Sequence, residues 1–406
     1  MSYRINNFKN SVHGFFLSAA VSIAEPATIL PLIIHHFSSS VVLVGLFASL
    51  LRGGAITVQL FAAFYAQSYS KVLPYLRIVF LFRLLSWFFI GLSIYLIGDT
   101  RPVMTLWLIG TGLFVFSFSA GFGGIYFKEI MAKVFSSSER GRTMANRQIF
   151  SSLGAIVSGG VAGYVLQNFQ APQNFAYLFM LSSLIMSIGL ITFITIDEPA
   201  KISTNKKEDS FRSFIANSAK ILKNDKKLQI QTAASLLGYS FLLAMPFVIL
   251  QAKESISLNG WIVGSFITVQ MIGGMIGNLF LWKSFGSHYV KMLMVAYSFM
   301  ITAFVIVFFA DNAWLYGLVF FIFGIGIDGF RNADMNLILE IAPEHKRPVY
   351  VAIQSTIVSF GLFFSIPGGF ILKTFGYYTL YSVTLSLLGV GLYMTYILKR
   401  VIKTTA

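Results

Sequence analysis

Two carboxylates and an arginine lie inside one long apolar stretch in the second half of the chain. Asp328, Arg331 and Asp334 follow one another at three-residue intervals within residues 313–342. Charge is expensive in hydrocarbon, so a membrane helix that carries these side chains must turn them toward protein or water. The patch therefore predicts a polar cavity inside a membrane protein.

The chemistry of this patch allows two interpretations. Side chains three residues apart are neighbours on a helix, so Arg331 is predicted to reach both aspartates. The three charges could simply neutralise one another. Alternatively, one aspartate exchanges a proton or another cation while the planar guanidinium of Arg331 binds an anionic group. Asp328 lies deepest by count along the stretch, and it is our first candidate for coupling.

A second pair of opposite charges is expected at mid-depth near the amino terminus. Glu25 lies near the centre of the first apolar run, just before Pro26, and Arg52 lies near the centre of the second run. Consecutive spans cross a membrane in opposite directions, so the two side chains could pair. They are candidates for a charged substrate contact or a protonatable carboxylate, and the alternative is a structural ion pair.

Composition indicates a membrane protein. Of the 406 residues, 56% are hydrophobic and only 11% are charged. A soluble domain of this length would need far more charged surface. A bilayer core about 30 Å thick requires about 20 apolar residues per helix. We therefore expect an all-α membrane protein with twelve transmembrane helices, at residues 11–37, 41–68, 74–98, 103–134, 142–168, 174–196, 228–252, 259–283, 289–310, 313–342, 347–373 and 377–398.

Metal and cofactor chemistry is not expected. The chain has no cysteine, which excludes thiolate metal sites and cysteine nucleophiles. His35 and His36 adjoin one another without a visible third ligand. No Gly-x-x-x-x-Gly-Lys-Ser/Thr loop is present, so ATP is not the expected energy source.

Positive charge is distributed unevenly among the predicted loops. Lysine and arginine gather at both termini, in alternate loops and in the linker of residues 197–227. The positive-inside rule places these segments, both termini included, in the cytoplasm. The formal net charge of +15 then reflects the orientation of the chain in the membrane and does not indicate nucleic-acid binding. Short loops without organelle signals suggest a bacterial inner membrane. The part of the linker between Ser210 and Leu228 is either a surface helix on anionic lipid or a solvated tether.

The two halves of the chain resemble each other. Three glycines of the fourth predicted span match three glycines of the tenth at one constant offset in residue number. A Glu and an Arg that follow each set match at the same offset. The first set is Gly112, Gly121, Gly124, Glu139 and Arg142, and the second is Gly317, Gly326, Gly329, Glu344 and Arg347. A parallel repeat predicts two pseudo-symmetric six-helix bundles, residues 1–196 and 228–406, with a substrate site at their interface.

The chain resembles the major facilitator superfamily over essentially its whole length. Tyr126 and Glu129 form the Tyr-x-x-Glu pattern that this family carries at the end of span four, and Arg140-Gly141 follows in the next loop. The family signature between spans two and three is degraded here to residues 64–71. Residues 159–163 resemble the glycine-rich motif of drug exporters but lack its proline.

A set of charged residues flanks spans four, five, ten and eleven. We interpret these residues as candidate gates, whose ion pairs would close the cytoplasmic side and break as the bundles rock. The alternative is ordinary snorkelling and positive-inside charge. The candidates are Glu129, Arg140, Arg142, Arg147, Glu340, Lys346 and Arg347.

The resemblance implies a secondary active transporter that moves a small organic solute by alternating access, with proton coupling as the default because the candidate groups are carboxylates. Such a chain would function as a monomer within the lipid bilayer. An exporter of amphipathic, drug-like compounds is an alternative. A non-transporting receptor is another. A membrane-embedded enzyme is not expected, because the loops hold no catalytic constellation.

Overall fold

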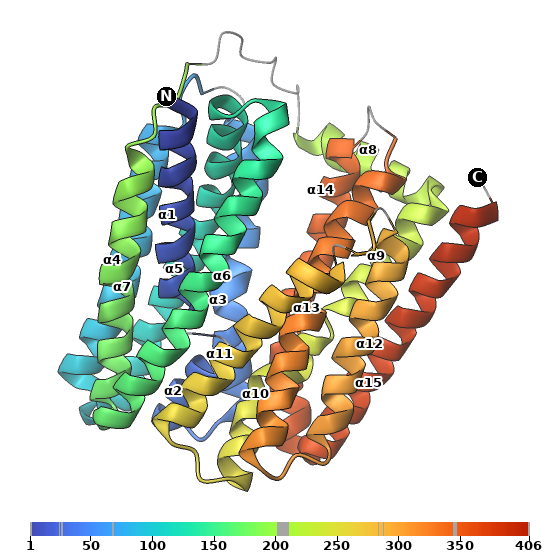
Figure 1. The fold of residues 1–406 in the computed structure, drawn as a ribbon. Coiled ribbons are helices and arrows are strands. Elements are labelled where there is room, and N and C mark those ends of the chain that lie inside the picture. The colour runs from blue at the N-terminus through green and yellow to red at the C-terminus, as the bar shows by residue number, and fades with distance from the viewer. Residues whose placement is uncertain are drawn as a thin grey trace. The chain divides into compact units, whose positions relative to one another are not determined.

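The computed structural model describes residues 2–23, 25, 27–66, 69–200, 211–282, 284–286, 288–343 and 347–404 (Figure 1). These residues are overwhelmingly helical, and none of them lies in a strand. Ten helical stretches among them are long and apolar enough to cross a membrane. The expected all-α membrane architecture is therefore confirmed.

The chain folds into two compact units. Unit 1 comprises the described residues of Met1–Ser40, Phe47–Lys207 and Leu258–Thr268, and unit 2 comprises those of Val41–Leu46, Glu208–Ser257 and Val269–Ala406. The main helices up to the linker are α1 (Ser2–Ile23), α2 (Ile29–Phe37), α3 (Val41–Ala66), α4 (Leu73–Ile97), α5 (Pro102–Val134), α6 (Ser137–Asn168) and α7 (Gln173–Ile194).

The remaining helices begin in the linker. They are α8 (Phe211–Asn224), α9 (Lys226–Gly238), α10 (Phe241–Ser255), α11 (Gly260–Ile276), α12 (Tyr289–Val307), α13 (Ala313–Ile341), α14 (Arg347–Val358) and α15 (Ser365–Thr404). A π-helical turn, η2 (Gly277–Trp282), continues α11, and the 3₁₀ turns η1 (Gly98–Thr100) and η4 (Ser359–Phe363) follow α4 and α14.

The first predicted span is broken, contrary to the expectation of one helix over residues 11–37. Helix α1 ends at Ile23 and α2 begins at Ile29, with Glu25 and Pro26 in the interval. Proline has no N–H to donate, which favours a break here. Ser182 Oγ donates to the carbonyl of Ala20 at 2.6 Å, so a side chain satisfies one of the carbonyls that the helix end leaves unpaired.

The seventh predicted span is broken in the same way. Helix α9 ends at Gly238 and α10 begins at Phe241. Pro246 lies inside α10 and cannot donate to the carbonyl of Leu242 four residues earlier. Ser365 Oγ donates to that carbonyl at 2.9 Å. A break in both the first and the seventh spans agrees with the internal repeat seen in the sequence.

Two predicted spans meet inside the element α15. Gly376 has φ of 79° and ψ of 178°, a left-handed φ that glycine adopts without steric cost. Two helices are joined across this kink. It lies in the interval predicted between the eleventh and twelfth spans.

The linker contains a docked helix, so for residues 211–224 the tether interpretation is wrong. Ile221 and Leu222 of α8 pack against a buried cluster that includes Leu228 and Tyr350. Asp225 caps α9 by accepting the N–H of Leu228 at 3.0 Å, and its other oxygen accepts the Tyr350 hydroxyl at 2.6 Å. Contact of α8 with lipid stays a prediction.

Close packing of α13 against α11 leaves no room for a side chain at Gly324. A Cβ added at Gly324 would lie 1.9 Å from the carbonyl oxygen of Gln270, whereas one added at Gly389 would meet nothing within 4 Å. We expect Gly324→Ala to destabilise the protein by about 1–3 kcal/mol through overpacking. Gly389→Ala should be neutral or slightly stabilising. Reversible denaturation in mixed micelles measures both, and equal stabilities would contradict the close helix approach.

A candidate functional site on helix α13

Asp334 is surrounded by neutral hydrogen-bond donors. Its Oδ1 accepts Gln231 Nε2 at 2.9 Å, Gln354 Nε2 at 2.8 Å and the hydroxyl of Ser235. Gln231 and Ser235 belong to α9 and Gln354 to α14, and all three are buried. Two helices of unit 2 thus fix one carboxylate oxygen of a third helix, α13. Within the described part of the chain, Oδ2 receives no hydrogen bond.

The expected pairing of Arg331 with Asp334 is wrong. The guanidinium of Arg331 lies 4.0 Å from the carboxylate of Asp328, and its side chain is 62% exposed. Among the described residues, no lysine or arginine forms an ion pair with Asp334. The aspartate is held by amides and a hydroxyl, which stabilise the anion by hydrogen bonding without adding positive charge. Such a carboxylate can take up a proton without breaking a salt bridge.

The internal repeat makes this environment informative. At the constant offset that relates the halves, Asp334 occupies the position of Glu129. Glu129 lies 3.7 Å from Lys133, so its charge has a compensating partner. The two halves therefore place carboxylates at equivalent positions, but among the described residues a cation adjoins only the carboxylate of the first half.

Asp328 belongs to a separate amide cluster. Its Oδ2 accepts Asn278 Nδ2 at 2.8 Å, and Asn278 Oδ1 accepts Asn332 Nδ2 at 2.6 Å. Asn278 lies on the π-helical turn η2, a kind of element frequently found at functional sites. On the same turn, Trp282 packs so closely on Gly329 that an added Cβ would lie 2.2 Å from the indole.

An exposed polar surface runs along α13 beside this cluster. Arg331 and Asn332 are exposed, and Asn336 donates to the Asn332 carbonyl at 2.7 Å. Charged and amide groups on a membrane-crossing helix must contact water or protein, because lipid cannot solvate them. The surface can therefore offer hydrogen bonds to a polar solute. Gln231, Ser235 and Asn278 were not singled out from the sequence, although Gln231 and Ser235 are i,i+4 neighbours on one helix face.

Glu25 lies in the break between α1 and α2. Its carbonyl accepts the N–H groups of Thr28, Ile29 and Leu30, at distances of 3.0–3.2 Å, and its carboxylate accepts the N–H of Ala27 at 3.4 Å. The residue is 9% exposed. These contacts start α2, and the pairing of Glu25 with the half-buried Arg52 stays a prediction.

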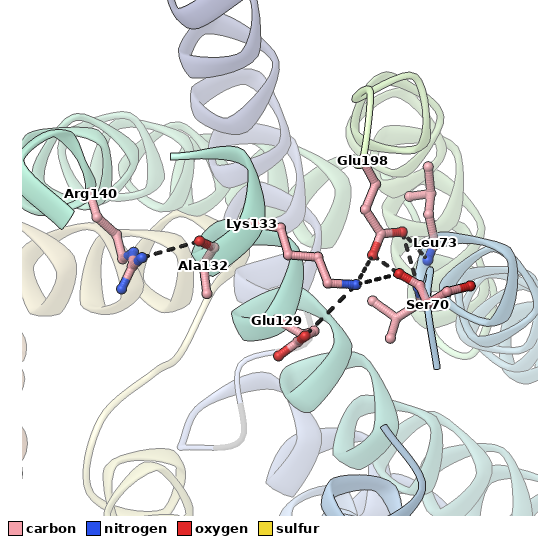
Figure 2. Close-up of polar contacts among 8 residues, drawn as sticks. Ser70, Leu73, Glu129, Ala132, Lys133, Arg140 and Glu198 are labelled. Atoms are coloured by element: carbon pink, nitrogen blue, oxygen red, sulfur yellow. Dashed lines mark hydrogen bonds and ion pairs between the residues drawn. The ribbon is translucent and has the colours of Figure 1, made fainter. Parts of the chain in front are cut away.

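Two of the candidate gates contact their own unit. Figure 2 shows Lys133 between Glu129 and Glu198. The Nζ atom of Lys133 lies 2.7 Å from Glu198 Oε1 and donates to the carbonyl of Ser70 at 2.9 Å. Arg140 caps α5, donating to the Ala132 carbonyl at 3.2 Å. Glu129 thus contacts Lys133 and Arg140 contacts the end of α5, both within unit 1, which supports a structural role for these two candidates.

The other candidate gates are dispersed. Arg142 and Glu340 are exposed, and Arg147 is directed into unit 1, where it contacts His13 and Asn10. Lys346 and the side chain of Arg347 lie outside the described residues. Gating by any of these residues therefore stays a prediction.

Ten helices long and apolar enough to cross a membrane indicate a polytopic membrane protein. The chain belongs to the Major Facilitator Superfamily, whose family model matches residues 11–366. No curated protein sequence matches the chain.

Solved structures support the same fold at low sequence identity. A mutant of the nucleoside transporter NupG is similar at a TM-score of 0.76 and 12% identity, with 97% of this chain and 99% of that chain covered. The human organic anion transporter MFSD10 (TETRAN) is similar at a TM-score of 0.67 and 10% identity, with 97% of this chain and 99% of that chain covered. A bacterial homologue of the iron transporter ferroportin, in an inward-facing state, is similar at a TM-score of 0.65 and 12% identity, with 98% of this chain and 99% of that chain covered.

Proposed function

We propose that the chain is a proton-coupled secondary transporter that moves a small polar organic solute across a membrane by alternating access. The observation that carries this proposal is Asp334, a carboxylate in a membrane-crossing helix whose three hydrogen-bond donors are all neutral. A group of this kind can change protonation state during a transport cycle. Ionisable residues within membrane spans are functional by default.

The roles of the two aspartates differ in this proposal. Asp334 exchanges the proton, in place of Asp328, which the sequence favoured. Asp328, Asn278 and Asn332 bind the solute, since their amides and carboxylate offer both donors and acceptors. Arg331 adds a positive charge at the exposed end of this cluster, which suits a zwitterion or an organic anion.

Twelve spans complete the proposed architecture. Two bundles, residues 1–196 and 228–406, rock about a solute held at mid-membrane, as parallel repeats in transporters do. Both termini and the linker lie in the cytoplasm of a bacterial cell, as the loop charges favour. The glycines at 159–163 have a packing explanation, because an added Cβ at Gly264 would lie 2.3 Å from the carbonyl of Gly159. They therefore give the exporter alternative no specific support.

Proton movement coupled to solute tests the function. Purified protein is reconstituted into liposomes that contain the pH-sensitive dye pyranine, and nucleosides, amino acids and small carboxylates are added outside in turn. We expect at least one solute class to change the internal pH, and protein-free liposomes exposed to the same solutes are the control. A solute that accumulates in the liposomes without any change in internal pH would contradict proton coupling.

A further inference from the structure

Unit 1 contains a basic cluster that the proposed transport cycle does not use. It consists of Asn10 and His13 on α1, Arg83 on α4 and Arg147 on α6. Asn10 is fully buried and His13 is 2% exposed. All four residues lie inside helices of unit 1, about two to three turns from the first residues of these helices, Ser2, Leu73 and Ser137.

Hydrogen bonding fixes the tautomer of His13. Arg147 Nη1 lies 2.8 Å from His13 Nδ1, and it also donates to the carbonyl of Asn10 at 3.1 Å. A guanidinium can only donate, so Nδ1 is the acceptor and the neutral imidazole carries its proton on Nε2. This N–H is buried and has no partner among the described residues.

Two further nitrogen donors of the cluster are also unused. Asn10 Nδ2 and Arg83 Nε are buried without a hydrogen-bond partner in the described part of the chain. Buried N–H groups normally have an acceptor, and each one left unpaired is costly. Three such donors in one small region indicate that an acceptor is missing.

The charge of the cluster points the same way. Arg83 follows Phe80 by three residues on α4, and the Phe80 ring lies 5.6 Å from the His13 ring, so the face of α4 that carries Arg83 adjoins His13 and its partner Arg147. Within the described ranges, no carboxylate forms an ion pair with either arginine. Each guanidinium lies over a phenyl ring, Arg83 at 4.6 Å from Phe116 and Arg147 at 4.7 Å from Phe127. A ring face attracts a cation, but it offers the unused N–H groups only a weak acceptor in place of a lone pair.

We propose that this cluster binds a compact anion, either a free halide or the carboxylate of a small organic acid. An anion would neutralise the repulsion between the two arginines and accept hydrogen bonds from the unused donors. The site is confined, because the His13 ring has the rings of Phe80, Phe127 and Phe193 at 5.6, 5.9 and 4.5 Å. That confinement favours small anions over bulky ones.

Anion-dependent thermal stability tests the proposal. The full-length protein in detergent is unfolded in the sodium salts of chloride, bromide and acetate, and of HEPES as a bulky sulfonate, at equal ionic strength and pH. A bound anion stabilises the folded state, so we expect the midpoint of thermal unfolding to rise saturably, by about 1–2 °C at several times the dissociation constant. If the midpoint rises in the two halides but not in acetate, the site binds a free halide. If it also rises in acetate, the site accepts a carboxylate. Identical midpoints in all four salts would overturn the proposal.

Variants locate the effect. Arg83→Gln should remove the anion-dependent rise, and Arg77→Gln, an exposed position on the same helix α4, should retain it. A rise that persists in Arg83→Gln would overturn the assignment. If Arg83→Gln does not fold, anomalous scattering from wild-type crystals soaked in bromide decides the question. A peak beside the guanidinium of Arg83 or Arg147 supports the site, and bromide bound only elsewhere excludes it.

Discussion

Asp334→Asn should abolish uphill transport while leaving exchange intact. An imposed gradient of one pH unit stores about 1.4 kcal/mol, enough for about tenfold accumulation by a one-proton symporter. Asparagine has the shape of aspartate, and its amide oxygen can accept the bonds of Gln231, Ser235 and Gln354, but it cannot carry the proton. We therefore expect the internal solute concentration in liposomes to stop at the external concentration.

Solute counterflow separates coupling from binding in this experiment. Exchange of labelled for unlabelled solute requires no proton gradient, so Asp334→Asn should retain it. Asp328→Asn makes the matched comparison, because it removes a charge from the same helix. We expect this variant to raise the half-saturation concentration but to keep accumulation in the gradient. If Asp334→Asn still accumulates solute tenfold and Asp328→Asn does not, the two roles are reversed.

The helices could be predicted because bilayer thickness sets their length. The predicted span at 103–134 corresponds to α5 (Pro102–Val134), and that at 289–310 to α12 (Tyr289–Val307). Both breaks escaped prediction, since hydropathy measures polarity and is blind to the hydrogen-bond geometry around proline. Helix α1 also begins at Ser2, well before the apolar run. Its Lys9 donates to the carbonyl of Thr195, just after α7, at 2.7 Å, so the charge of this lysine is held at the C-terminal end of a helix.

The site could be located from the sequence, but its pairing could not. Two aspartates in an apolar run are visible in the residue pattern, and spacing alone suggested that Arg331 joins them. In the structure the two aspartates have different partners, because α9 and α14 present two amides and a hydroxyl to Asp334 while Arg331 lies beside Asp328. What a neighbouring helix offers at a given depth depends on register and rotation, which a single sequence does not reveal. His13 and Arg83 were missed for the same reason.

Glu198 should contribute more to the stability of unit 1 than any exposed charge. It is 2% exposed, it accepts the N–H of Leu73 at 2.8 Å, and both of its oxygens contact the N–H of Val72, so it caps the start of α4 (Figure 2). An anion at a helix N-terminus is favoured by the helix dipole. Lys133, with a side chain 9% exposed, completes the pair at 2.7 Å. The contact ties the end of α5 to α4 and to the segment after α7.

Removing one member of this pair leaves the other charge buried without its partner. We expect Lys133→Met to destabilise the protein by about 3–5 kcal/mol, the usual cost of breaking a buried ion pair. Glu129→Gln is the control, because Glu129 is more exposed and lies 3.7 Å from Lys133, so its loss should cost under about 1 kcal/mol. Both free energies of unfolding are measured by reversible denaturation in mixed micelles.

The double variant Lys133→Met/Glu198→Gln distinguishes charge from capping. If the cost of Lys133→Met comes from the uncompensated carboxylate, neutralising Glu198 as well should recover part of it, giving a coupling energy of about 1–3 kcal/mol. The glutamine keeps a side-chain oxygen for the N–H groups of Val72 and Leu73, so the cap survives in part. Strict additivity would instead show that Lys133 and Glu198 act independently. In that case α4 is anchored by the cap alone, and the lysine only shields the end of α5.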